Sequence, residues 1–366
     1  MNGNDSSTMP NSRLQSFHLF DNPTEFQSAM LDDIRHAKHF VFLETYKYAN
    51  DNVGHAFRDA LIQKAKEGVK VKILIDSWGA YVSEAYFAEL TKLGGEVRFF
   101  KKIRFSYDFF TKNHRRNHHK VLVIDNKISY IGSANITGYS MQWREAVLRM
   151  EGTISISFGK TFRESFKIYR KYIFNKFAYK KTIIQGDFEI VQDIPSIYRQ
   201  QIKNKYESLI KRAKKEVLIE TPYFLPGYML RKALTDASKR GVKVKVIMPW
   251  HSDMRAVDLL RGKYLGVFFK NGIETVFYTP SNLHAKTMLI DNEVFAIGSP
   301  NFDYRSFRYQ HEIVLIGRHK GIISQLRNHL QETLKDCIPF DHISWQRRPQ
   351  FEKFLGWALI PFRHLF

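Results

Sequence analysis

The sequence predicts an α/β protein made of two homologous α-β-α sandwich halves, each a mixed sheet flanked by helices, which pair around a pseudo-twofold axis. Three observations predict this fold. A six-residue motif occurs twice with identical internal spacing, 166 residues apart. A helix-like segment and the strand-like segment after it recur 173 residues later. In both halves strand and helix periodicities alternate, which is typical of α/β layers. The first motif comprises His118, Lys120, Asp125, Gly132, Ser133 and Asn135, and the second comprises His284, Lys286, Asp291, Gly298, Ser299 and Asn301.

The predicted order before each motif is strand, helix, strand. Residues 40–45 (FVFLET) predict a strand, and residues 54–68 (GHAFRDALIQKAKEG) place apolar side chains on one helical face. Gly68 follows the last turn of that helix, where a positive φ is favoured. In residues 69–75 Val and Ile alternate with Lys, which indicates a strand with one wetter side. The second half repeats these elements at residues 217–221, 227–241 and 241–249.

Each motif lies on a predicted hairpin. Residues 119–124 predict a strand, and His118 and Lys120, two residues apart, should share one face of it. Residues 125–126 supply the turn and residues 129–131 the return strand. The corresponding segments of the second half are 287–290, 291–292 and 294–297. A later stripe predicts the core face of a helix and consists of Phe158, Phe162, Phe166, Tyr169, Ile173 and Phe177.

Length and composition favour two domains and an anionic partner. The chain has 366 residues, and Lys and Arg exceed Asp and Glu by 21. That excess favours nucleic acid, an anionic bilayer or an acidic substrate. The single cysteine, Cys337, excludes an intramolecular disulfide and fits a reducing compartment. We expect a polar N-terminal segment (1–16), a first half (17–185), a second half (186–340) and a basic-aromatic tail (341–366).

Membrane contact is expected at the tail. The first residues lack the apolar stretch of a secretion signal, and no apolar run reaches the roughly 18 residues of a spanning helix. The tail is basic and aromatic but too short to span, which suits an anchor at a lipid surface. Packing against the protein's own core is the alternative, and Pro361 interrupts a simple helix. The expected membrane-binding residues are Trp345, Arg347, Arg348, Phe354, Leu355, Trp357 and Phe362.

The paired motifs predict a phosphodiester site. One imidazole can attack phosphorus while a second moves protons, so His118 and His284 would act together. Lys120 and Lys286 would neutralise the phosphoryl oxygens. Further hydrogen bonds to the same oxygens would come from Asn135, Asn301, Ser133 and Ser299. This chemistry requires no divalent metal and no other cofactor.

Four acidic residues complete the candidate catalytic set. Glu145 and Glu312 each follow a motif and could accept a hydrogen bond from a histidine Nδ1. Asp125 and Asp291 end the motif strands, and a turn or backbone role is the alternative to a catalytic one for them.

The doubled motif resembles the HKD motif of the phospholipase D superfamily. Within that superfamily the chain is most similar to bacterial cardiolipin synthases that lack N-terminal transmembrane helices. The segments that carry this finer similarity are Asn113–Asp125 (NHRRNHHKVLVID), Trp143–Glu145, Thr221–Gly227 (TPYFLPG), Leu283–Asp291 (LHAKTMLID) and Asn301–Phe307 (NFDYRSF).

This resemblance implies a phosphatidyltransferase that works through a phosphohistidine. His118 would be the nucleophile and His284 the general acid/base. Phosphatidylglycerol would donate the phosphatidyl group to a hydroxyl of a second phospholipid, at an anionic membrane. We therefore expect a peripheral membrane protein on the cytoplasmic face of the inner membrane. The acceptor lipid and the oligomeric state stay open.

Three other functions remain possible from the sequence. They are a phospholipase D that hydrolyses phospholipids, a nuclease of the same superfamily, and a lipid-binding protein without activity. Intact histidines argue against the last, and the aromatic tail makes nucleic acid an unlikely partner. The aromatic and basic segment Arg98–Lys112 predicts either an acyl-chain entrance or ordinary packing.

Overall fold

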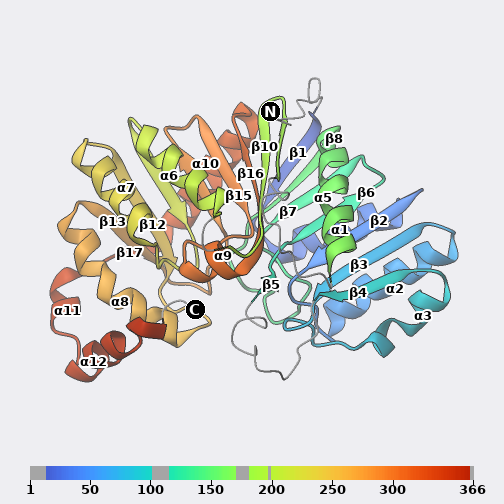
Figure 1. The fold of residues 1–366 in the computed structure, drawn as a ribbon, viewed down its shortest axis with the longest axis horizontal. Helices are drawn as coiled ribbons and strands as arrows, with labels where there is room; N and C mark the ends of the chain where they lie inside the picture. Colours follow the sequence, from blue (N-terminus) through green and yellow to red (C-terminus); the bar gives the residue numbers. More distant parts are fainter. Residues whose placement is uncertain (1–13, 101–114, 170–180, 197–198, 363–366) are drawn as a thin grey trace, which may run out of the picture.

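The computed structural model describes residues 14–100, 115–169, 181–196 and 199–362. Two α/β halves lie side by side, each with a mixed sheet and helices on its faces (Figure 1). This arrangement confirms the predicted fold class. Most of the polar N-terminal segment, and residues 101–112 of the aromatic and basic segment, lie outside the described residues.

The first sheet has seven strands. They are β1 (Leu14–Phe20), β2 (Phe40–Thr45), β3 (Lys70–Asp76), β4 (Glu96–Phe100), β6 (Val121–Ile124), β7 (Ile128–Gly132) and β8 (Val147–Gly152). Their order is β1-β8-β7-β6-β2-β3-β4. β2, β3 and β4 are parallel, whereas β6 joins β2 antiparallel and continues into the β6–β7–β8 meander.

The second sheet repeats this topology. Its strands are β9 (Lys181–Gln185), β10 (Phe188–Asp193), β11 (Glu216–Glu220), β12 (Lys243–Pro249), β13 (Ile273–Tyr278), β14 (Thr287–Ile290), β15 (Val294–Gly298), β16 (Gln310–Gly317) and β17 (Cys337–Pro339). Their order is β17-β13-β12-β11-β14-β15-β16-β10-β9. The short strand β5 (Arg116–Asn117) comes from the first half of the sequence but pairs with β16.

Helices cover both faces of each sheet (Figure 1). The α-helices are α1 (Pro23–Arg35), α2 (Asn52–Lys66), α3 (Ala88–Lys92), α5 (Ile154–Ile168), α6 (Gln201–Arg212), α7 (Tyr228–Lys239), α8 (Arg255–Lys270), α9 (Tyr304–Tyr309), α10 (Lys320–Lys335), α11 (His342–Gln346) and α12 (Gln350–Ala358). The described residues also form the 3₁₀ turns η1 (Glu84–Phe87) and η3 (Ile360–Phe362). Within the described ranges, no helix has both the length and the apolar character needed to cross a bilayer.

One hydrophobic core is continuous between the halves. It joins apolar residues of both sheets with those of α5 and α10, whereas α1 and α2 close a separate core on the first sheet and α6 and α7 close one on the second. Phe158, Phe162 and Phe166 of the predicted aromatic stripe are buried in the central core. Tyr169 packs against its edge, and the last two stripe residues, Ile173 and Phe177, lie outside the described residues.

The repeated turns have the backbone that their sequences predict. Gly68 and Gly241 have φ of 83° and 87°, as expected for a residue that ends a helix in the left-handed region. The motif hairpins turn through Asp125–Asn126 and Asp291–Asn292, whose φ values lie between 52° and 56°. Two consecutive positive φ angles give a type I′ turn, whose twist matches a β-hairpin.

Two boundaries differ from those predicted. The boundary at residue 185 is wrong by one strand, because β9 pairs with β10 through a hairpin at Gly186 and so belongs to the second sheet. The strand predicted over residues 119–124 begins only at Val121. The residues before it leave the first sheet, since the His118 N–H donates to His311 O of the other half at 2.9 Å.

The tail folds against the second half (Figure 1). The Trp345 ring lies directly on Gly266 of α8, and its Nε1 donates to Gly262 O at 2.6 Å. A Cβ at position 266 would come within 2.3 Å of that ring, so glycine is required there. Arg348 stacks on the outside of Trp345, with its guanidinium 4.1 Å from the ring centroid. Trp345 therefore packs on α8 and is only half-buried, and the expectation that it contacts the membrane stays a prediction.

The other Phe and Trp residues in the described part of the tail face outward. Phe354, Trp357 and Phe362 are 59%, 65% and 52% exposed, and Phe351, which the sequence analysis did not select, is 69% exposed. Arg347 is also exposed, whereas Leu355 is half-buried. α12 packs along α8, with Gly356 close to the Leu259 carbonyl.

Candidate active site

Each motif histidine is held by the backbone of the opposite half. Strand β5 pairs with the start of β16, so that His118 N–H donates to His311 O. In the equivalent place His284 N–H donates to Arg144 O at 2.7 Å, and Arg144 N–H donates to Asn282 O at 2.9 Å. These two reciprocal bridges bring each histidine beside the glutamate that follows the other half's motif.

The histidine–glutamate pairs therefore cross between the halves. His284 Nδ1 lies 2.8 Å from Glu145 Oε1, and His118 Nδ1 lies 3.1 Å from Glu312 Oε1. All four side chains are buried. An imidazole that donates from Nδ1 to a carboxylate keeps its Nε2 for a reaction partner. The predicted contacts of both glutamates with histidine Nδ1 atoms are confirmed.

The two serines serve the glutamates instead of a ligand. Ser133 Oγ donates to Glu145, and Ser299 Oγ donates to Glu312. Each Oγ also accepts a backbone N–H, from Ala146 at 3.1 Å or from Ile313 at 3.0 Å. Both serines are fully buried. The prediction that they donate to phosphoryl oxygens is wrong in this structure, because their protons are used to orient the carboxylates.

The two lysines form a buried cationic pair. Lys120 Nζ donates to His118 O at 2.9 Å, and Lys286 Nζ donates to His284 O at 2.6 Å. Burial lowers the pKa of Lys120 well below its usual value, and the charge of Lys286 lowers it further. Burial likewise lowers the pKa of Lys286 to about 8. An anion bound between them would raise the pKa of both ammonium groups and so stabilise their charges, which is the electrostatic requirement of a phosphoryl site.

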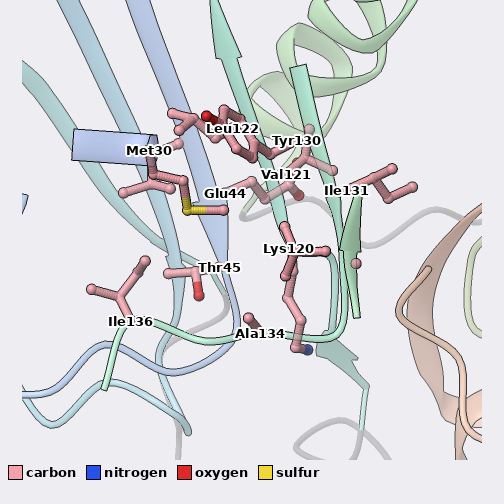
Figure 2. Close-up of a pocket in the computed structure, with 13 residues that line it drawn as sticks. Met30, Glu44, Thr45, Lys120, Val121, Leu122, Tyr130, Ile131, Ala134 and Ile136 are labelled. Carbon is pink, nitrogen blue, oxygen red and sulfur yellow. The ribbon is translucent and has the colours of Figure 1, made fainter. Parts of the chain in front are cut away.

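Figure 2 shows how Lys120 reaches this position. Its side chain runs past Ala134, away from the apolar side chains of Leu122 and Tyr130, and carries the nitrogen beyond them. The cavity behind it measures about 20 Å³, which is enough for about one water molecule. The apolar packing thus fixes the lysine stem while its ammonium group faces the site.

The motif asparagines are in equivalent places with different partners. Asn135 Oδ1 accepts the Lys47 N–H at 3.2 Å, which leaves its amide nitrogen as a donor. Asn301 is anchored through its own N–H, which donates to Ser306 Oγ at 3.1 Å. Its Oδ1 is buried and has no hydrogen-bond partner among the described residues. Both amides are therefore available to a ligand.

The motif aspartates are remote from this site. Asp125 accepts the N–H groups of residues 38, 39 and 40 at 2.7–2.9 Å, and Asp291 accepts those of residues 214, 215 and 216 at 2.7–2.9 Å. Each carboxylate thereby fixes the start of β2 or β11, at the opposite end of the motif strand from the lysine. These contacts show that the prediction of a catalytic role for Asp125 and Asp291 is wrong. The alternative, a role in holding the backbone, is confirmed.

Electrostatics distinguish the two glutamates. Burial raises the pKa of Glu312 to about 7, although Ser299 donates to it. Burial also acts upward on the pKa of Glu145, but the charge and hydrogen bond of His284 outweigh it, and the net shift is downward. Glu145 therefore stays ionised where Glu312 is partly protonated.

The pKa values of the two histidines are both lowered, but that of His284 is supported by its glutamate and that of His118 is not. Burial lowers the pKa of His118 well below 6.5, and the charges of Lys120 and Lys286 lower it further. Burial also lowers the pKa of His284, but Glu145 opposes that shift. The charge of His284 acts on His118 as well, so the two rings belong to one electrostatic site.

Several residues of the site were not selected from the sequence. The Tyr46 ring lies edge-on to His118 with centroids 5.0 Å apart, and the Lys120 ammonium is 5.4 Å from the same ring. Trp143 lies 5.3 Å from His284. Tyr46 and Lys47 directly follow the predicted strand 40–45, and ligands of open α/β sheets bind at the carboxyl ends of strands. This rule could have identified Tyr46 and Lys47 as site residues from the sequence.

No metal site accompanies this arrangement in the described part of the chain, where no three His, Cys, Asp or Glu side chains are grouped to hold an ion. Among the motif residues, the polar groups that remain free to meet a ligand are the imidazole Nε2 atoms, the two ammonium groups and the two asparagine amides. They are suited to a tetrahedral phosphoryl group with anionic oxygens.

Two halves that exchange histidine–glutamate contacts around paired lysines define the class, a phospholipase D-like fold with one shared site. Residues 30–168 and 206–334 match the family model described as "Cardiolipin synthase, PLD-like domain". The major cardiolipin synthase ClsA of Bacillus subtilis (strain 168) is 32% identical over 347 residues, covering 90% of this chain and 71% of that protein. A cardiolipin synthase of Clostridium perfringens (strain 13 / Type A) is 30% identical, covering 94% and 75%.

A solved structure shares the fold. Phosphatidylserine synthase of Haemophilus influenzae Rd KW20 superposes with a TM-score of 0.76 at 13% sequence identity, covering 96% of this chain and 95% of that one. The chain thus belongs to the cardiolipin synthase family with phospholipase D-like domains. It is a phosphatidyltransferase of the phospholipase D superfamily.

Proposed function

We propose that this protein transfers a phosphatidyl group from phosphatidylglycerol to a hydroxyl of a second phospholipid, and that glycerol leaves. The observation that carries the proposal is the crossed pair of histidine–glutamate contacts around two buried lysines. The named activity of the similar proteins supports the choice of lipid substrates.

The proposed reaction has two balanced steps. The lone pair of His118 Nε2 attacks phosphorus, the P–N bond forms, and the bond to the glycerol oxygen breaks as His284 donates its proton to that oxygen. The acceptor hydroxyl then attacks phosphorus, His284 takes its proton, and the P–N bond breaks. Lys120 and Lys286 neutralise the phosphoryl oxygens in both steps.

The choice of His118 as nucleophile is supported by the charge distribution. A nucleophile must be neutral, and the pKa of His118 is lowered well below its usual value, by burial first and then by two lysine charges. The acid must hold a proton, and the ionised Glu145 at the Nδ1 of His284 opposes the burial that lowers the pKa of this imidazole, whereas the charges beside His118 lower its pKa further. The near-symmetric motifs alone do not make this distinction.

We further propose that the protein works at the cytoplasmic face of the inner membrane as a peripheral protein. The exposed aromatics of α12 and η3, with Arg347 nearby, suit the headgroup region of an anionic bilayer. The excess of basic residues over the whole chain supports the same partner.

The test uses purified protein, vesicles of phosphatidylglycerol, and EDTA. We expect cardiolipin and free glycerol by thin-layer chromatography, and a phosphatidyl adduct on the His118 peptide by mass spectrometry after rapid quenching. His118→Ala and His284→Ala should each reduce turnover at least about a thousandfold, as with other nucleophile–base pairs. An adduct on His284 would reverse the two roles.

Other outcomes point elsewhere. Phosphatidic acid as the sole product would identify a hydrolase, and plasmid cleavage without lipid turnover would identify a nuclease. A normal rate in either histidine variant would mean that the assigned site is wrong.

A further inference from the structure

A row of three side chains extends the site from His284 to solvent. The Trp143 ring lies 5.3 Å from His284, and the Tyr139 ring lies 5.2 Å from Trp143. Lys47 Nζ donates to Tyr139 Oη at 2.8 Å and lies 5.3 Å from the centroid of that ring. Tyr139 is 48% exposed, whereas His284 is buried. We call Lys47, Tyr139 and Trp143 the His284 wall.

Lys47 carries an unneutralised charge at the outer end of this wall. In the described part of the chain, no carboxylate forms an ion pair with its ammonium group. Lys47 belongs to neither motif, yet it lies beside the site, since its N–H bonds Asn135 and its charge acts on Lys120. A half-buried cation at the mouth of a phosphoryl site favours a second anion there.

The second half does not repeat this feature. Thr45 Oγ1 donates to Lys47 O at 3.1 Å, and Thr221 Oγ1 donates to Tyr223 O at 3.1 Å, so Lys47 and Tyr223 occupy equivalent turns. Tyr223 donates its hydroxyl to Asp253. The duplicated fold thus places a cation in the first of these turns and a hydroxyl held by a carboxylate in the second, and the charge of that carboxylate, Asp253, also acts on Tyr139 and His284.

The proposed reaction tells which substrate meets the His284 wall. His284 protonates the departing glycerol and later takes the proton of the acceptor hydroxyl, so both alcohols occupy the space beside its ring. A water molecule that acts as the acceptor needs only this contact with His284. An acceptor phospholipid has a further group, its own phosphate, which the glycerol unit places farther out along the wall, toward Lys47.

We propose that Lys47, Tyr139 and Trp143 form the acceptor subsite, in which Lys47 binds the phosphate of an anionic acceptor phospholipid and Trp143 supports its glycerol unit. This inference rests on the proposed function and assigns the acceptor side of the site to residues outside both motifs. Lys47 then determines the partition of the phosphatidyl-enzyme between a lipid acceptor and water.

The experiment measures that partition with the full chain on phosphatidylglycerol vesicles. Lys47→Gln should lower cardiolipin formation about tenfold or more, because a charge-assisted contact is lost. The initial burst of glycerol release should stay within about twofold, and the share of phosphatidic acid should rise. Exchange of labelled free glycerol into phosphatidylglycerol should be unchanged, because that acceptor has no phosphate.

Three variants serve as controls. Lys47→Arg should retain most cardiolipin formation, and Tyr139→Phe, which removes the hydrogen bond to Lys47, should cause a smaller change in the same direction. Lys66→Gln removes a lysine of α2 that pairs with Glu89 at 3.0 Å, far along the chain from either motif, and should change no product. Melting curves verify that each variant is folded.

Two results would overturn the inference alone. One is an unchanged ratio of cardiolipin to phosphatidic acid in Lys47→Gln, and the other is an equal fall of all products together with the glycerol burst. A further test uses vesicles that also contain phosphatidylethanolamine. If Lys47→Gln selectively loses the product of transfer to phosphatidylethanolamine and keeps cardiolipin formation, the wall binds a zwitterionic acceptor and the proposal is contradicted. Wild-type protein that forms no cardiolipin would refute the proposed function itself, and the inference with it.

Discussion

At the scale of single residues, charge decides what two nearly identical motifs do. The Nδ1 atoms of His118 and His284 have equivalent partners, yet Glu145 stays ionised while burial raises the pKa of Glu312 to about 7. Both glutamates are buried, but the charge and hydrogen bond of His284 outweigh burial only at Glu145, which makes the two pairs unequal. Acid and nucleophile roles can therefore separate without a change of residue type.

The first residue-scale prediction concerns Glu145→Gln. This change removes the negative charge beside His284, so the pKa of the imidazole falls further below 6.5. The proposed acid then loses its proton at lower pH, and the alkaline limb of the pH profile for glycerol release should shift to lower pH. At pH 7 the rate should fall about 10- to 100-fold.

The measurement is kcat/KM between pH 5 and 9. Glu312→Gln is the matched control, because it alters the partner of His118, and it should leave the alkaline limb in place. An unmoved limb in Glu145→Gln would mean that His284 is not the acid.

The second residue-scale prediction concerns Lys286→Met. The folded-state pKa of Lys286 is about 8, below its ordinary value of 10.5, so between these pH values the unfolded chain binds more protons and stability rises with pH. Below pH 8 the destabilisation is present in full, up to about 3 kcal/mol by the size of the shift. Lys286→Met should therefore raise Tm at pH 7 by several degrees and abolish turnover.

The control for this prediction is a ligand. Inorganic phosphate should raise the Tm of the wild type, because it relieves the repulsion between the buried cations, and should have less effect on Lys286→Met. A lower Tm in the variant would show that the buried charge is compensated within the protein.

At the scale of elements, the tail shows how one short segment serves two purposes. α11 fixes the segment to the protein through Trp345 on Gly266, and α12 then presents Phe351, Phe354 and Trp357 to solvent. The two alternatives of the sequence analysis, self-packing and membrane contact, are therefore divided between successive helices. The first is observed, and the second remains a proposal.

The element-scale prediction separates these purposes. Phe354→Ser with Trp357→Ser should weaken sedimentation with phosphatidylglycerol vesicles about tenfold or more, because each exposed aromatic contributes buried apolar area at the bilayer. Cleavage of a soluble phosphodiester should be unchanged. Trp345→Ala should instead lower Tm, since it empties the contact with α8. Equal vesicle binding by wild type and double variant would exclude α12 as the membrane contact.

At the scale of the whole molecule, the site exists only where the halves meet. β5 pairs with β16, each histidine pairs with the other half's glutamate, and the central core is shared. Closing the halves therefore buries apolar surface and completes the catalytic contacts in one event.

The whole-molecule prediction is that neither half acts alone. Fragments 14–169 and 181–362, produced separately, should be inactive as monomers and should bind a hydrophobic dye, because each exposes its share of the central core. Co-expression should restore measurable activity through the crossed pairs. A monomeric fragment, verified by size-exclusion chromatography, with wild-type activity would contradict the shared site.

The repeat, the α/β alternation and the motif spacing were enough to predict the two halves, the hairpin turns and most of the site residues. These features are local, since a side-chain period or a turn preference depends on neighbouring residues. The contacts of Glu145 and Glu312 with histidine Nδ1 atoms were also anticipated from their position after each motif. The sequence did not predict that each glutamate contacts the histidine of the other half.

Only the tertiary structure decided which residues of the motif face a ligand. Ser133 and Ser299 turn to the glutamates, Asp125 and Asp291 clamp the strands β2 and β11, and β9 joins the second sheet. Such outcomes depend on how two distant segments pack, and sequence spacing carries no information about that packing. The sequence determined the chemistry available to this protein, and the closure of its two halves determined where that chemistry is used.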